Sequence, residues 1–149
     1  MKTIYSPVSG EIINLSDVPD EVFASRVLGD GVGIYPSNGK VYAPFDGTVS
    51  MLFPTRHAAG LTSKEGLELM IHIGIDTVTM SGNGFVAHIK PEQEVAKGQL
   101  IMEFDIKKIT HSGLSPIVIL LLTNQQKSGN VILEPVSTIM AMQKLLDVI

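Results

Sequence analysis

Aliphatic and other residues alternate without a break along residues 67–75, with leucine or isoleucine at every odd position. Successive side chains of a β-strand point to opposite faces, so this pattern predicts a strand with one fully apolar face for the core. The other face carries His72 between a methionine and a glycine, and Asp76 follows on the same parity. We therefore expect His72 to point away from the core, where another molecule can reach it.

Short apolar runs separated by turn residues continue through most of the chain, which contains 14 glycines and 8 prolines. The runs expected to form strands include residues 10–15, 31–35, 47–52 and 99–104. Short strands at regular spacing are typical of sandwiches and barrels. The sequence thus predicts an all-β fold, a sandwich or a barrel with few short helices.

Helical signals are weak and lie in two places. Residues 19–24 can form a single helical turn. Near the end of the chain, apolar residues recur at helical spacing and predict a short C-terminal helix. These residues are Ile139, Met142, Leu145, Leu146 and Ile149.

Residues 4–12 and 41–49 share one pattern. Each copy has an apolar residue, tyrosine, a small residue, proline, two spacers, glycine, one spacer and a β-branched residue. Proline favours a turn and glycine tolerates positive φ, so each copy predicts a strand, a turn and a return strand. The alternative is a common turn that recurs by chance, but the shared tyrosine and proline favour duplicated hairpin units packed face to face.

The size and composition fit one domain over residues 1–149. The chain has no cysteine, which excludes disulfides, thiolate metal ligands and a thiol nucleophile. A net charge of −4 without a basic cluster argues against nucleic-acid binding. The longest apolar run, residues 117–122, is far shorter than the roughly 20 residues that a membrane span needs. We expect no direct membrane insertion and a cytoplasmic location.

The candidate chemistry depends on histidines. His57 precedes His72 by 15 residues, a spacing that lets a hairpin bring the two together. Two adjacent imidazoles could bind a metal with a third ligand, act as an acid–base pair, or combine a nucleophile with a supporting hydrogen-bond donor. The plain alternative is that each is an ordinary surface or core histidine, which we keep for His88 and His111.

Thr55 and Asp76 are the candidate supporting residues. The Thr55 hydroxyl could hold one ring nitrogen of His57 and so fix its tautomer. Asp76 could either stabilise the turn after the strand or supply negative charge that orients an imidazole and raises its basicity. The spacing alone leaves both readings of Asp76 open.

Residues 72–78, together with His57, closely resemble the glucose-type IIA component of the bacterial phosphoenolpyruvate-dependent sugar phosphotransferase system. The resemblance spans roughly residues 4–123. It includes residues 6–11, 17–20, 22–24, 29–31, 43–48 and 103–105. It implies an antiparallel β-sandwich with a shallow apolar active-site depression.

The same resemblance implies a phosphoryl relay. His72 corresponds to the residue that accepts a phosphoryl group from the histidine phosphocarrier protein HPr and passes it to the IIB domain of a sugar permease. His57 corresponds to the second active-site histidine, Thr55 to its hydrogen-bonding partner, and Asp76 to the aspartate beside the acceptor. No cofactor is required.

The resemblance also implies an apolar rim on which partners dock. Its residues are Phe23, Phe53, Met70 and Val78. Met70 replaces a more usual aromatic residue, and Arg56 is unexpected before His57. We interpret both departures as adjustments of partner choice.

Other functions compete with the relay. Family members often bind metabolic enzymes or permeases as regulators, and a zinc ion held by His57 and His72 could be completed by such a partner. Residues 43–49 and 95–100 are similar to parts of biotinyl and lipoyl carrier domains, but no lysine stands in the setting those carriers need. The segment after about residue 123 departs from the family pattern.

Overall fold

The computed structural model describes residues 2–124 and 131–149 and shows a mostly antiparallel β fold. One sheet has eight strands in the order β13 (Thr138–Ile139), β2 (Gly10–Asn14), β3 (Asp30–Pro36), β11 (Val118–Leu122), β7 (Glu68–Ile73), β6 (Ala58–Ser63), β5 (Gly47–Leu52) and β9 (Glu94–Val95). A second sheet contains β1 (Lys2–Tyr5), β14 (Lys144–Val148) and β12 (Val131–Leu133). A third contains β4 (Lys40–Tyr42), β10 (Leu100–Phe104) and β8 (Phe85–Ala87). The helices are α1 (Glu21–Ala24), α2 (Ile106–His111) and the 3₁₀ turns η1 (Leu15–Asp17) and η2 (Thr77–Met80).

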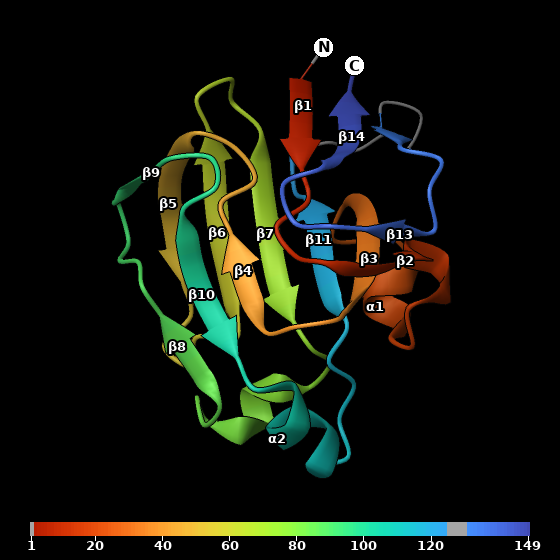
Figure 1. Ribbon diagram of the computed structural model, residues 1–149, viewed down its shortest axis with the longest axis vertical. Coiled ribbons are helices and arrows are strands. Elements are labelled where there is room, and N and C mark those ends of the chain that lie inside the picture. Colours follow the sequence, from red (N-terminus) through yellow and green to blue (C-terminus); the bar gives the residue numbers. More distant parts are fainter. Residues whose placement is uncertain (1, 125–130) are drawn as a thin grey trace.

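The sheets pack as layers around an apolar core. Figure 1 shows β4, β10 and β8 in front of β5, β6 and β7. Buried side chains from both layers, among them Val41, Leu61, Ile71 and Ile101, form one cluster between them. The predicted antiparallel β-sandwich with few short helices is confirmed.

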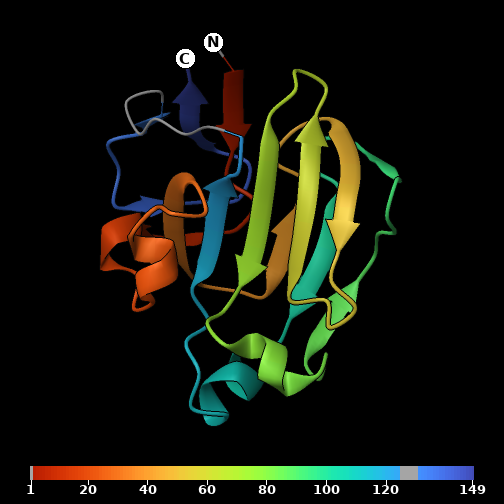
Figure 2. The ribbon, with the colours of Figure 1, turned by 180° about the vertical axis from the view of Figure 1, so that it is seen from behind.

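Strand β7 has the predicted alternation. Leu69, Ile71 and Ile73 are buried in the core, whereas Met70 and His72 are only partly buried on the opposite face. This outer face is seen in Figure 2, where β11, β7 and β6 lie toward the viewer and α1 lies beside β11. His72 therefore lies on a strand with a neighbour on each side in the eight-stranded sheet.

A second, smaller apolar cluster covers part of this outer face. It joins Phe23 of α1 and Leu15 of η1 to Ile119 and Leu121 of β11, and Met70 packs against it. The predicted helical turn is thus α1. The carboxylate of Asp20 caps this helix by accepting hydrogen bonds from the backbone N–H groups of residues 22 and 23.

The duplicated sequence pattern corresponds to a duplicated structure. Tyr5 N–H donates to the carbonyl oxygen of Pro44 (3.2 Å), and Tyr42 N–H donates to that of Pro7 (2.8 Å). The prediction that each copy is a hairpin is wrong, because β1 and β2 lie in different sheets, as do β4 and β5. The proline and glycine form a corner at which the chain crosses between layers.

The predicted C-terminal helix is wrong as well. Residues 144–148 form β14, which pairs with β1 and β12, and residues 138–139 form β13 beside β2. Met142 has φ +72°, which an α-helix interior does not allow. Backbone pairing on both sides of β14 thus outweighs the helical spacing of its apolar residues. The segment closes the second sheet.

Candidate active site

The two candidate histidines lie side by side at one end of the β6–β7 hairpin. Ala58 of β6 pairs with His72 of β7, and Ile73 N–H donates to the carbonyl oxygen of His57 at 2.7 Å. The two imidazole rings are 5.0 Å apart between centroids and nearly perpendicular, at 81°. His57 precedes β6 by one residue. The structure therefore brings together the two residues that the sequence predicted as a pair.

The His72 ring is oriented by a backbone carbonyl. Its Nδ1 lies 2.8 Å from the carbonyl oxygen of Gly74. A carbonyl can only accept, so Nδ1 carries the proton and Nε2 of the neutral ring keeps a free lone pair. Glycine permits this turn because the backbone at residue 74 has φ +77°, and a Cβ there would clash with a methyl carbon of Thr77.

The His57 ring is oriented by a side chain. Thr55 Oγ1 lies 2.6 Å from His57 Nδ1, which is the contact that the sequence predicted. When the hydroxyl donates to Nδ1, Nε2 carries the proton and is a donor. His57 is 2% exposed, and the Phe53 ring packs edge-on against it at 5.1 Å.

Both imidazoles are neutral near pH 7. Burial, and after it the positive charge of a protonated His72, lowers the pKa of His57 from 6.5 to about 4. Burial also lowers the pKa of His72, although the Gly74 hydrogen bond, Asp20 and Asp76 act in the opposite direction. A neutral imidazole with a lone pair on Nε2 is a nucleophile, and its neighbour is an uncharged hydrogen-bond donor.

Comparison with known proteins decides the family. The family model for the phosphoenolpyruvate-dependent sugar phosphotransferase system, EIIA 1, matches residues 2–128. The chain belongs to this EIIA family. It is 47% identical over 146 residues to the PTS system glucose-specific EIICBA component of Staphylococcus saprophyticus, covering 98% of this chain and 21% of that relative. The chain therefore spans about a fifth of the length of this curated relative.

A solved structure supports the same assignment. Glucose permease IIA from Mycoplasma capricolum superposes with a TM-score of 0.86 at 35% identity, covering 97% of this chain and 93% of that one. The fold of this EIIA is thus the fold of a solved glucose-type IIA.

The four rim residues predicted for this EIIA differ in exposure, and two of them, Phe23 and Phe53, contact the histidine rings. Phe23 is 8% exposed, and its ring lies 5.0 Å from that of His72. Phe53 and Met70 are partly buried, and Val78 of η2 is 51% exposed. Phe23 and Phe53 therefore form the walls of the site, and Val78 is the most accessible part of the rim.

Asp20 and three exposed apolar residues on and after α1 were not predicted as parts of the site. The negative charge of Asp20, at the N-terminus of α1, raises the pKa of His72, and so does that of Asp76, which precedes η2. Val22, Val27 and Leu28, on and just after α1, are 52%, 74% and 43% exposed. The sequence signal was an aspartate before a helical turn, which indicates a cap but not its distance from a strand far along the chain.

Asp76 does not act as a side-chain cap. It has φ +60°, and its backbone oxygen, rather than its carboxylate, accepts from Thr79. Its negative charge raises the pKa of His72, whereas the imidazole ring itself is oriented by the Gly74 carbonyl.

The remaining histidines of this EIIA lie apart from the pair. His88 Nε2 is 2.8 Å from a Glu103 carboxylate oxygen on the third sheet, and His111 ends α2. In residues 2–124 and 131–149, no group of three or more histidine, cysteine or acidic residues could hold a metal ion. None of the helices in those ranges is long and apolar enough to cross a membrane.

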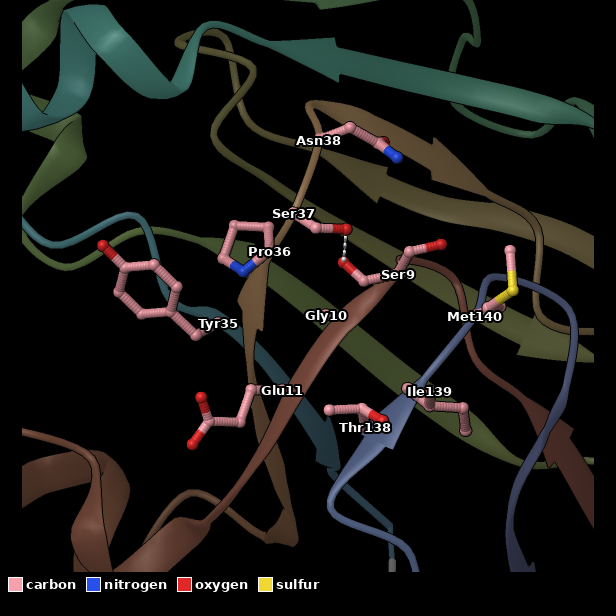
Figure 3. Close-up of a pocket in the computed structure, with 10 residues that line it drawn as sticks. All are labelled: Ser9, Gly10, Glu11, Tyr35, Pro36, Ser37, Asn38, Thr138, Ile139 and Met140. Carbon is pink, nitrogen blue, oxygen red and sulfur yellow. Dashed lines mark hydrogen bonds between the residues drawn. The ribbon is translucent and has the colours of Figure 1, made fainter.

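A hollow of about 540 Å³ lies elsewhere, at the edge formed by β13, β2 and β3 (Figure 3). Its lining includes Glu11, Tyr35, Ser37 and Thr138, but none of the site residues. This hollow therefore offers no imidazole.

Proposed function

We propose that this chain relays a phosphoryl group in sugar uptake: His72 accepts it from phosphorylated HPr and passes it to the IIB domain of a sugar permease. The observation that carries this proposal is the hydrogen bond from His72 Nδ1 to the Gly74 carbonyl, which leaves Nε2 as the nucleophile. Membership of the EIIA family supports the same partners.

Acceptance is a displacement at phosphorus. The lone pair of His72 Nε2 forms the new N–P bond while the N–P bond of the donor phosphohistidine breaks, and the electron pair returns to the donor ring. The phosphorylated His72 ring keeps its Nδ1 proton and becomes cationic. The Gly74 carbonyl stabilises that charge through the existing hydrogen bond.

His57 supports the transferring group. A pKa of about 4 keeps this ring neutral, so one ring nitrogen donates and the other accepts. With Nδ1 held by Thr55, the Nε2–H of His57 is available to a phosphoryl oxygen. A donor that is already oriented stabilises charge in the transition state without reorganising.

The surroundings suit alternating protein partners. An apolar rim binds without strong directional preference, so the same surface can serve a donor and an acceptor in turn. Asp20 and Asp76 place two carboxylates near His72, and a docked partner with a cationic side chain there would complement them.

Reconstitution tests the proposal. Phosphoenolpyruvate, enzyme I, HPr, this chain and a cognate membrane permease lacking its own IIA domain are combined, and sugar phosphate is measured. We expect sugar phosphate only when this chain is present. A chain that takes no label from phosphorylated HPr would overturn the proposal.

A regulatory role is a second candidate, favoured by the distance between the rings. Both Nδ1 atoms are occupied, so the two Nε2 atoms are available to a zinc ion. Two protein ligands are fewer than a zinc site normally has, so His57 and His72 would need a carboxylate or other ligand from a regulated enzyme or permease. Zinc-dependent binding to such a partner, lost in His57→Ala, tests this role.

A further inference from the structure

The backbone at Arg56 is in a conformation that does not suit arginine. Phe53 to Arg56 form a turn closed by a hydrogen bond from Arg56 N–H to the Phe53 carbonyl oxygen (2.8 Å), with Pro54 in its second position. Arg56, the last residue of this turn, has φ +58°, which lies in the left-handed region where glycine or asparagine is favoured. An arginine at such a position, immediately before His57, suggests that its side chain has a functional role.

The arginine side chain is held rather than free. Its Nη2 approaches the carbonyl oxygen of Gly82 at 3.5 Å, in the loop after η2. A Cβ on Gly82 would lie 2.9 Å from the same nitrogen, so the guanidinium occupies the space that a side chain there would need. Gly82 itself has φ +84°. The two loops beside the histidine pair are thus joined through this guanidinium.

The charge of Arg56 is not neutralised within the described part of the chain. The residue is exposed and takes part in none of the ion pairs formed by residues 2–124 and 131–149. A guanidinium has five N–H donors in a rigid fork that fits a carboxylate. Two carboxylates, Asp20 and Asp76, therefore act on His72, and an arginine without an ion-pair partner among the described residues stands immediately before His57.

We propose that Arg56 is a specificity-determining docking residue that binds a carboxylate side chain on the relay partner. This inference rests on the proposed relay and deepens it. Charges of both signs beside the histidine pair select the orientation of the partner as well as its affinity.

The test uses a substitution that the backbone prefers. Arg56→Asn suits positive φ, so we expect its melting temperature to be equal to or above that of the parent. The same variant should bind phosphorylated HPr or the IIB domain about fivefold to tenfold more weakly, and Arg56→Glu weaker still. The loss should appear in KM, with kcat nearly unchanged, and should shrink as salt is added.

Lys64→Glu is the matched control. It makes the same change of charge at an exposed position just after β6, at the opposite end of that strand from His57 (Figure 1). We expect it to bind both partners like the parent. Reversing the acidic residues of the partner's docking face to lysine, one at a time, should identify one change that restores binding to Arg56→Glu.

Two results would overturn the inference. One is that Arg56→Glu and Lys64→Glu behave alike toward both partners. The other is that Arg56→Asn unfolds at lower temperature and loses binding only in proportion to its unfolded fraction, which would make Arg56 a structural residue. If the parent takes no label from phosphorylated HPr, the proposed relay is wrong. Direct titration of each variant with HPr and IIB then still decides whether Arg56 contributes to docking.

Discussion

His72 and Gly74 form one unit: the imidazole Nδ1–H of the first donates to the backbone carbonyl of the second at 2.8 Å, across a turn that only glycine fits. The turn is anchored on its other side, because Gly74 N–H donates to the Ile117 carbonyl oxygen at 2.8 Å. The tautomer of the nucleophile is thus determined by the backbone of β7 and its following turn, not by another side chain.

Replacing Gly74 should therefore reduce both stability and transfer. In Gly74→Ala the new methyl group would meet Thr77 and the carbonyl of Ser115, and the backbone would be strained at φ +77°. We expect a loss of about 2 kcal/mol or more in the free energy of unfolding. Urea denaturation measures the loss, and labelling below the transition measures transfer. Gly66→Ala is the control, because that glycine also has positive φ but has open space around it. Equal losses in the two variants would contradict the packing argument.

The rim can be tested with a matched pair of substitutions. Val78→Asp adds a charge to an exposed residue of η2, and Ile132→Asp does the same on β12, where the side chain is 50% exposed. Because neither side chain is in the core, both should change the free energy of unfolding by less than about 1 kcal/mol. Only Val78→Asp should weaken HPr binding, by about tenfold, in a calorimetric titration. Similar binding by the two variants would remove Val78 from the docking surface.

Stability should depend on pH through His57. Its pKa is about 4 in the folded chain and 6.5 when exposed, so between these values the unfolded chain binds a proton that the folded chain does not. The contribution of the neutral His57 ring to the free energy of unfolding is fully present above pH 6.5 and is lost as the pH falls toward 4. One such proton gives a slope of up to about 1.4 kcal/mol per pH unit. Urea denaturation across this range should show a steeper fall for the parent than for His57→Gln. Parallel curves would mean that His57 titrates normally.

His57→Gln should also separate the two halves of the relay. The nucleophile and its Gly74 hydrogen bond remain, so acceptance from HPr should be close to that of the parent. Onward transfer to IIB should fall at least about tenfold, because the oriented N–H that supports the leaving phosphoryl group is altered. Single-turnover transfer from the labelled variant to isolated IIB measures this step. Normal sugar phosphorylation by the variant would show that His57 has no supporting role.

The sequence predicted the parts of the site that local pattern determines. Alternation along β7 separated the buried Ile71 and Ile73 from the outward His72, and a two-residue spacing placed Thr55 beside His57. The proximity of Asp20 to His72 was not predictable, because it depends on how α1 packs against β11 through the second apolar cluster.

The C-terminal error has a different cause. Helical spacing in residues 139–149 coincided with a segment whose structure is determined by its partner strands. A second repeated feature distinguishes this segment from a helix. The side-chain Oε1 of Gln99 accepts a hydrogen bond from Ala96 N–H, and that of Gln143 accepts one from Met140 N–H in the same way. The two glutamines occupy equivalent turns before β10 and β14. Comparing these turns would have predicted a strand after Gln143.

The central claim is that His72 Nε2 carries the phosphoryl group, and site-resolved labelling tests it most directly. The parent and His72→Ala are incubated with phosphoenolpyruvate, enzyme I and HPr, and the acid-labile label on each is measured, with ³¹P–¹⁵N couplings assigning the phosphorylated nitrogen in the parent. We expect about one label per parent chain, on Nε2, and none on His72→Ala. Label that persists on a folded His72→Ala chain, or that lies on Nδ1 of the parent, would contradict the account.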